Sequence, residues 1–130
     1  MRFIFLPFLM LLAAPGTPVE ETRAIMTRYF VCVRDAAAKF ARTSSEGADT
    51  IAEAAMGACV AREEISRREY IRVMVSQVGL SAGNAQQAWD DEHEQIRVMA
   101  RRLALAATMK ERYDESCDPS KLTNDITYVC

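Results

Sequence analysis

The chain contains a single histidine, His93, in the segment DDEHEQIR at residues 90–97. Glu94 follows it and Arg97 lies four residues after it, so a histidine in place of Arg97 would complete the motif HExxH. In HExxH, two histidines one helical turn apart bind zinc and the glutamate acts as a base. Arg97 occupies the second histidine position, and a cation repels a metal ion. We therefore interpret the segment as a polar helix surface, with a weak metal site at Asp90, His93 and Glu94 as the alternative.

A second candidate is the segment GLSAG at residues 79–83, which fits the G-x-S-x-G pattern of a nucleophile elbow. Asp90 and His93 follow Ser81 in the order of a Ser-Asp-His triad. The elbow needs a strand that turns sharply at the top of a large α/β sheet, and this chain is too short for such a sheet. Gly79 as a helix end and Ser81 as a helix cap explain the same letters. We therefore expect no catalytic, cofactor-binding or metal-binding residues.

The four cysteines are Cys32, Cys59, Cys117 and Cys130. An even number in a small exported chain predicts two disulfides, because such bridges persist in oxidising compartments. Structural zinc sites contain closely spaced ligand pairs such as C-x2-C, whereas here the nearest pair is separated by 12 residues. The absence of C-x-x-C-H also excludes covalently attached haem.

The pairing of the cysteines follows from a helical hairpin. The segment TSSEG, residues 43–47, lies midway between Cys32 and Cys59. If the helices on either side run antiparallel, both cysteines lie about 20 Å from the turn, at roughly 1.5 Å per residue. The sequence therefore predicts the bridge Cys32–Cys59 and, by elimination, Cys117–Cys130. The two crossed pairings are the alternatives.

The first residues, MRFIFLPFLMLLAAPG, have the layout of a secretory signal peptide: Arg2 is followed by an apolar run over residues 3–14. That run is too short to span a bilayer as a helix, which needs about 20 residues. Ala14 and Gly16 are small residues at positions −3 and −1 of a cut before Thr17. We therefore expect a cleaved signal at residues 1–16 and export to the periplasm or the extracellular space. An uncleaved anchor or a buried first helix is the alternative.

Cleavage would leave residues 17–130, which is one domain's worth of chain, with a disulfide-closed tail at residues 117–130. Loss of Arg2 changes the formal net charge from −2 to −3. A mildly acidic chain offers no broad basic face, so we expect no nucleic-acid partner. No other segment is long and apolar enough to cross a membrane, so we expect no membrane association after cleavage.

Apolar residues recur at spacings of three and four, which predicts an all-α bundle of three to four main helices. The first helix is expected at residues 18–42, with a capping box formed by Thr17 and Glu20. Residues 46–78 form either one helix or two helices with a bend near Ser66, where SRRE resembles a second capping box. Ser44 or Ser45 is expected to cap this second stretch.

The last helix follows Ser81 and carries a long apolar stripe. Its predicted core residues are Ala85, Trp89, Ile96, Met99, Leu103, Ala106 and Tyr113. On the preceding stretch, the i,i+4 pairs Glu63–Arg67 and Glu64–Arg68 are expected to form surface ion pairs.

These observations lead to an expected function. A small, disulfide-linked helical scaffold without a catalytic set fits a non-catalytic protein that binds another protein outside the cytoplasm, as an inhibitor, immunity factor or assembly partner. The alternative is a carrier for a small apolar ligand, suggested by the methionines and alanines, and an enzyme of unfamiliar type is a minor one. An internal cavity of several hundred Å³ would favour the carrier, and an exposed apolar patch would favour the partner.

Overall fold

The computed structural model describes residues 16–113 and is all-helical over that range, as predicted. Two expectations lie outside the described residues: the signal segment up to residue 15 and the Cys117–Cys130 bridge. The described elements are four α-helices and one short π-helical turn. They are α1 (Pro18–Thr43), α2 (Ala48–Ala58), α3 (Val60–Val73), the π-helical turn η1 (Met74–Val78) and α4 (Ala82–Tyr113).

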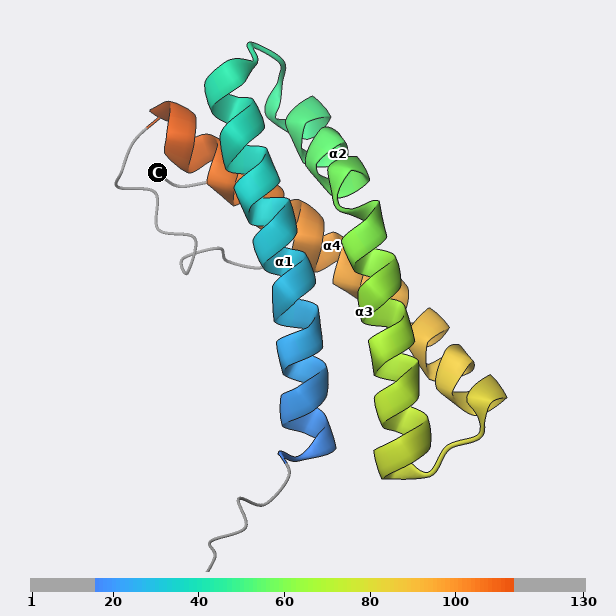
Figure 1. Cartoon of the computed structure of the whole chain (residues 1–130). Coiled ribbons are helices and arrows are strands. Elements are labelled where there is room, and N and C mark those ends of the chain that lie inside the picture. Colours follow the sequence, from blue (N-terminus) through green and yellow to red (C-terminus); the bar gives the residue numbers. More distant parts are fainter. Residues whose placement is uncertain (1–15, 114–130) are drawn as a thin grey trace, which may run out of the picture.

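Figure 1 shows how these elements are arranged. The helix α1 rises from the bottom to the top of the view, and α2 followed by α3 descends beside it. The long helix α4 crosses behind them and packs against both α1 and α2. One side of the α1–α4 seam is therefore covered by α2, while the opposite side carries the groove described below.

The start of α1 is fixed by the predicted capping box. The Glu20 backbone N–H donates to Thr17 Oγ1 at 3.3 Å, and the Thr17 backbone N–H donates to Glu20 Oε2 at 3.1 Å. Pro18 occupies the first helical turn, where its missing N–H costs nothing. The helix ends at Thr43, one residue beyond the expected boundary.

The second helical stretch is two helices, and the break between them lies at Cys59 rather than near Ser66. Cys59 departs from helical geometry, with φ −103° and ψ 10°, two residues after Gly57, a residue with low helix propensity. Ser66 lies inside α3, where its buried hydroxyl donates to the Ile25 carbonyl of α1 at 3.3 Å. That acceptor on another helix satisfies the hydroxyl, so Ser66 does not act as a helix cap.

The turns at the ends of α2 and η1 follow different chemistry. The expected serine cap of α2 is wrong, because the helix begins after Gly47 without a side-chain cap and Ser44 Oγ accepts from the Glu46 N–H instead. Gly79 adopts the left-handed conformation expected of it, with φ 81°. Ser81 caps α4 as predicted, because its Oγ accepts from the Asn84 N–H at 3.2 Å.

The core contains many alanines, which allow the helices to approach closely. Ala37 on α1, Ala55 on α2, and Ala100 and Ala104 on α4 are fully buried. Larger core residues pack among them, including Tyr29, Val33, Ile51, Met56, Tyr70, Trp89 and Ile96.

The predicted disulfide Cys32–Cys59 is confirmed, with Cα atoms 6.1 Å apart. It ties α1 to the break between α2 and α3. Three members of the expected α4 stripe do not lie in the core: Met99 is 52% exposed, Tyr113 is 68% exposed, and Leu103 is half-buried and lines an open groove. The buried stripe uses Ala100 and Ala104 instead, because the close helix contact selects small side chains over large apolar ones.

Candidate functional site

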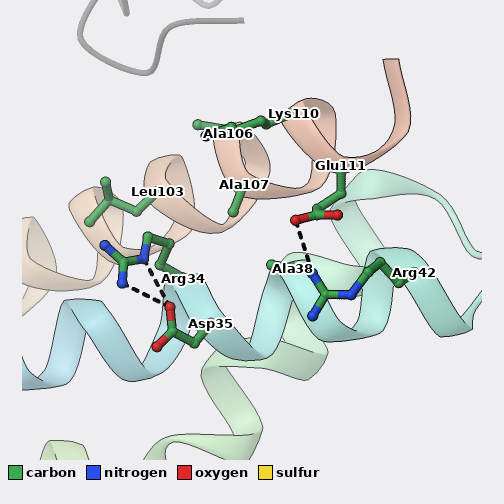
Figure 2. A pocket seen from close by; sticks show the side chains of 9 residues that line it. All are labelled: Arg34, Asp35, Ala38, Arg42, Leu103, Ala106, Ala107, Lys110 and Glu111. Atoms are coloured by element: carbon green, nitrogen blue, oxygen red, sulfur yellow. Dashed lines mark hydrogen bonds and ion pairs between the residues drawn. The ribbon is translucent and has the colours of Figure 1, made fainter. Parts of the chain in front are cut away.

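An open groove of about 480 Å³ runs between α1 and α4 (Figure 2). Nine residues line it: Arg34, Asp35, Ala38 and Arg42 from α1, and Leu103, Ala106, Ala107, Lys110 and Glu111 from α4. Residues 44–81 separate the two helices in the sequence, so only tertiary packing brings these side chains together.

The small side chains of the groove leave its space open. Ala38 on α1 and Ala107 on α4 lie across from each other in Figure 2, and a methyl group fills little of the gap between the helices. Leu103 lies near Arg34, at the end of the groove away from the Arg42–Glu111 pair. Met99 lies one helical turn before Leu103, and this spacing places it on the same face of α4. Met99 is 52% exposed on that face but is not one of the residues that line the groove.

Charged side chains lie at both ends of the groove. Arg34 pairs with its neighbour Asp35 at 2.9 Å, and Arg42 pairs with Glu111 across the two helices at 2.9 Å. Lys110 is exposed and brings the number of basic groups to three, against two acidic ones. Exposed ion pairs contribute only about 0–1 kcal/mol each, so these charges can exchange their present partners for those of a bound molecule.

One end of the groove is held by Arg112, a contact that sequence reasoning did not identify. Its guanidinium donates to the Ser44 carbonyl at 2.6 Å and to the Ala41 carbonyl at 3.4 Å, with a further bond to Glu46. The last carbonyls of a helix have no partner within the helix and carry negative partial charge. Arg112 satisfies such a group and fixes the last turn of α4 against the α1–α2 connection.

A second candidate site lies between α3 and α4 and contains His93. Its Nε2 contacts Glu63 Oε1 of α3, and its ring stacks on Trp89 with centroids 5.7 Å apart. Trp89 in turn packs edge-on against Tyr70, at 5.5 Å. The side chains of His93 and Glu63 are 35% and 13% exposed. The expectation of a simple polar helix surface is therefore wrong for His93, because α3 packs against that face.

Tyr29 of α1 lies next to this pair. Its hydroxyl is buried and makes no hydrogen bond of normal geometry within the described part of the chain. Burial, reinforced by the negative charge of Glu63 and partly offset by Arg97, raises the pKa of Tyr29 to about 12. The carboxylate is thus close enough to act on the phenol electrostatically, although the two do not form a well-aligned bond. The cluster joins α1, α3 and α4.

The expected ion pairs on α3 are half correct. Glu64 approaches Arg68 at 3.8 Å, as expected, but Arg67 pairs with Glu64 at 2.7 Å rather than with Glu63. Glu63 faces the interior and is engaged by His93. The two adjacent glutamates therefore contact different helices: Glu64 pairs with arginines of α3, and Glu63 contacts His93 of α4.

The structure places Ser81 and His93 in separate contacts. The Ser81 hydroxyl accepts a backbone bond at the start of α4, and His93 faces Glu63, not Ser81. Within residues 16–113 no group of three or more His, Cys, Asp or Glu side chains is placed to hold a metal ion. A shallow pocket of about 270 Å³ adjoins the cluster and is lined in part by Glu63, Trp89 and His93.

Comparison with family models, with curated proteins and with solved structures gave no match. Among the described helices, none has a stretch long and apolar enough to cross a membrane.

Proposed function

We propose that this chain is an exported, non-catalytic helical protein that binds another protein, of the inhibitor, immunity or assembly-partner type. The observation that carries the proposal is the α1–α4 groove. It has small alanine side chains and Leu103 along its length and charges at both ends. Protein interfaces combine an apolar centre with a polar rim in this way.

The shape of the groove favours a protein partner over a small carried ligand. Carrier sites are largely apolar and bury most of their ligand. This groove is open to solvent along its length, and five of its nine lining residues are charged. A side chain or helix edge from a partner protein fits such a surface better than a small apolar molecule does.

The proposal includes an antiparallel hairpin formed by α1 with α2 and α3. Contacts between α1 and the returning helices step in opposite directions: Glu21 approaches Arg72, Ile25 accepts from Ser66, and Cys32 is bonded to Cys59. That order supports an antiparallel arrangement of α1 against α2 and α3. The hairpin would hold the α1 face of the groove in place without help from a partner.

Export is supported by two features of the described residues. The Cys32–Cys59 bridge is the kind of bond that persists in an oxidising compartment. The capping box begins at Thr17, so cleavage of the expected signal before this residue would leave the complete cap on the mature chain. We propose the periplasm or the extracellular space as the location.

The absence of an assembled reactive set among the described residues supports binding rather than catalysis. Ser81 accepts from the Asn84 backbone N–H, and His93 contacts Glu63. The two residues therefore have different partners. The mildly acidic charge of the chain likewise gives no support for a nucleic-acid partner.

The proposal can be tested by comparing capture from an extract of the exported compartment by three forms of the protein. These are the unmodified protein, the groove variant Arg34→Glu/Lys110→Glu, and the control variant Arg68→Glu/Arg72→Glu on α3. The control changes the net charge equally at side chains that are 66% and 65% exposed. We expect a protein bound by the unmodified and control forms to be lost from the groove variant. Equal capture by all three forms would exclude the groove as its binding site.

The carrier hypothesis predicts a different result for protein purified from the same compartment. Native mass spectrometry of the purified protein would then show a stoichiometric small molecule, and its occupancy would fall when the groove is altered. If the partner is a protein, native mass spectrometry of the purified chain would show only the mass of the chain itself.

A further inference from the structure

The two sulfurs of the Cys32–Cys59 bridge differ in their exposure. Cys59 is 1% exposed, at the break between α2 and α3. Cys32 is half-buried and lines an open groove of about 360 Å³, together with Thr27, Arg28, Val31 and Arg62. A molecule in solution can therefore approach the bridge from the Cys32 side only.

The groove beside Cys32 is positively charged. Arg28 and Arg62 line it, and none of its lining residues is acidic. Arg28 also pairs with Glu69 at 3.0 Å, which reduces its influence. Arg62 is exposed and makes no ion pair with another residue of the described range, so no such partner offsets its charge in the groove.

We propose that Cys32 is a site of thiol–disulfide exchange with small, negatively charged thiols, for which glutathione is the probe. The positive groove would raise the local concentration of an anionic thiol, as clefts lined by one sign of charge do for ions of the opposite sign. The buried Cys59 sulfur is placed to be the leaving group, since it lies on the interior side of the bridge.

The exchange is balanced without any further reagent. A glutathione thiolate attacks Cys32 Sγ and forms a new S–S bond, while the Cys32–Cys59 bond breaks and its electron pair leaves on Cys59 Sγ. Cys59 then takes a proton from water. A second glutathione thiolate attacks the glutathione sulfur of the mixed disulfide, which yields oxidised glutathione and releases the Cys32 thiolate.

The second step uses the same arginines in another way. The departing Cys32 thiolate is negatively charged, and nearby cations stabilise thiolates. Two electrons have then passed from two glutathione molecules to the bridge, and α1 is no longer bonded to the α2–α3 break. The structure thus assigns different roles to the two cysteines: Cys32 accepts the incoming thiol and Cys59 leaves.

The test measures the rate of bridge opening by two thiols in the full-length protein at 0.15 M salt. Glutathione is the anionic thiol, and cysteamine, whose thiolate carries a compensating ammonium group, is the neutral one. The ratio of their rate constants, compared between variants, cancels their intrinsic reactivities. The variants are Arg62→Glu and the control Arg68→Glu, six residues or about 9 Å further along α3.

We expect Arg62→Glu to lower the glutathione-to-cysteamine ratio about fivefold, because it reverses a charge that lines the same groove as Cys32. The control should change the ratio by less than about 1.5-fold, since its charge lies more than a Debye length further away. Both side chains project into solvent, and circular dichroism would confirm that both variants are folded.

Acid quenching, alkylation and peptide mass spectrometry locate the first mixed disulfide. Cys32 and Cys59 fall in separate tryptic peptides, residues 29–34 and 43–62. Glutathione found first on the Cys32 peptide supports the proposal. Glutathione on the Cys59 peptide, equal ratios in the two variants, or a native bridge that resists glutathione while the urea-unfolded one reacts would each overturn it.

Discussion

The contact between His93 and Glu63 should be measurable as a coupling free energy. His93→Ala removes the only imidazole and leaves a carboxylate that is 13% exposed facing the buried Tyr29 hydroxyl. A hydrogen bond to a charged group contributes about 1.5–3 kcal/mol, and the partial exposure of His93 places this one at the low end. Loss of the stack on Trp89 adds about 0.5–1 kcal/mol. We therefore expect His93→Ala to lower the free energy of unfolding by about 2 kcal/mol.

The matched measurement is a double-mutant cycle with Glu63→Gln, followed by urea unfolding at pH 7. Glu63→Gln alone should cost about 1 kcal/mol. The double variant should cost less than the sum of the two by about 1 kcal/mol, because a neutral glutamine at this position no longer leaves a charge without a partner. The control Glu94→Gln, on an exposed neighbour, should change stability by less than about 0.5 kcal/mol. Additive costs, within about 0.3 kcal/mol, would refute the coupling and return His93 to a solvated surface role.

Three further predictions concern the bridge, the buried phenol and the start of the chain. Replacing Cys32 and Cys59 together by serine should lower the free energy of unfolding by about 3–4 kcal/mol in a denaturant titration, because the bridge closes a loop of 27 residues, and no change would show that the bridge adds no stability. The pKa of Tyr29, raised to about 12, favours the neutral phenol in the folded state, so stability present below pH 10 should fall as the pH rises from 10 to 12, by about 2–3 kcal/mol in total. Tyr29→Phe should abolish that alkaline loss and raise stability at pH 7 by about 1 kcal/mol, and an unchanged pH profile in thermal unfolding would contradict the assignment. Edman sequencing of the exported protein should begin at Thr17, whereas a sequence that begins at Met1 would refute cleavage.

Several local signals in the sequence predicted local structure correctly, although the expected serine cap of α2 did not form. The Thr17–Glu20 capping box, the left-handed Gly79 and the Ser81 cap each depend on a few adjacent residues, and all three are present. The Cys32–Cys59 bridge was also predictable, because the two cysteines lie at equal distances from the break at TSSEG.

Features that depend on contacts between distant helices were not predictable in this way. Nothing near His93 in the sequence indicates Glu63, 30 residues earlier, and the two meet only because α3 packs across α4. In the sequence Ser66 resembled a helix cap, but in the fold its hydroxyl donates to the Ile25 carbonyl of α1. The alanine stripe of α4 was missed for a similar reason: alanine is compatible with core and surface alike, so the neighbouring helix decides its burial.

The α1–α4 groove could not be predicted from the sequence. Its α1 and α4 faces are polar or alanine-rich and show no pattern that distinguishes them from an ordinary helix surface. Only the crossing of the two helices creates the space between them.

The bonds from Arg112 to the α1–α2 connection determine when the fold can be completed. They join residues 66 to 71 positions apart, and Arg112 is the last but one residue of α4. A chain made from its N-terminus therefore cannot form them until nearly all of α4 has left the ribosome, and contacts between such distant residues form slowly. Every shorter nascent chain lacks the contacts that fix the last turn of α4 against the α1–α2 connection. If the chain is exported as we propose, late closure of this kind would keep it open for translocation.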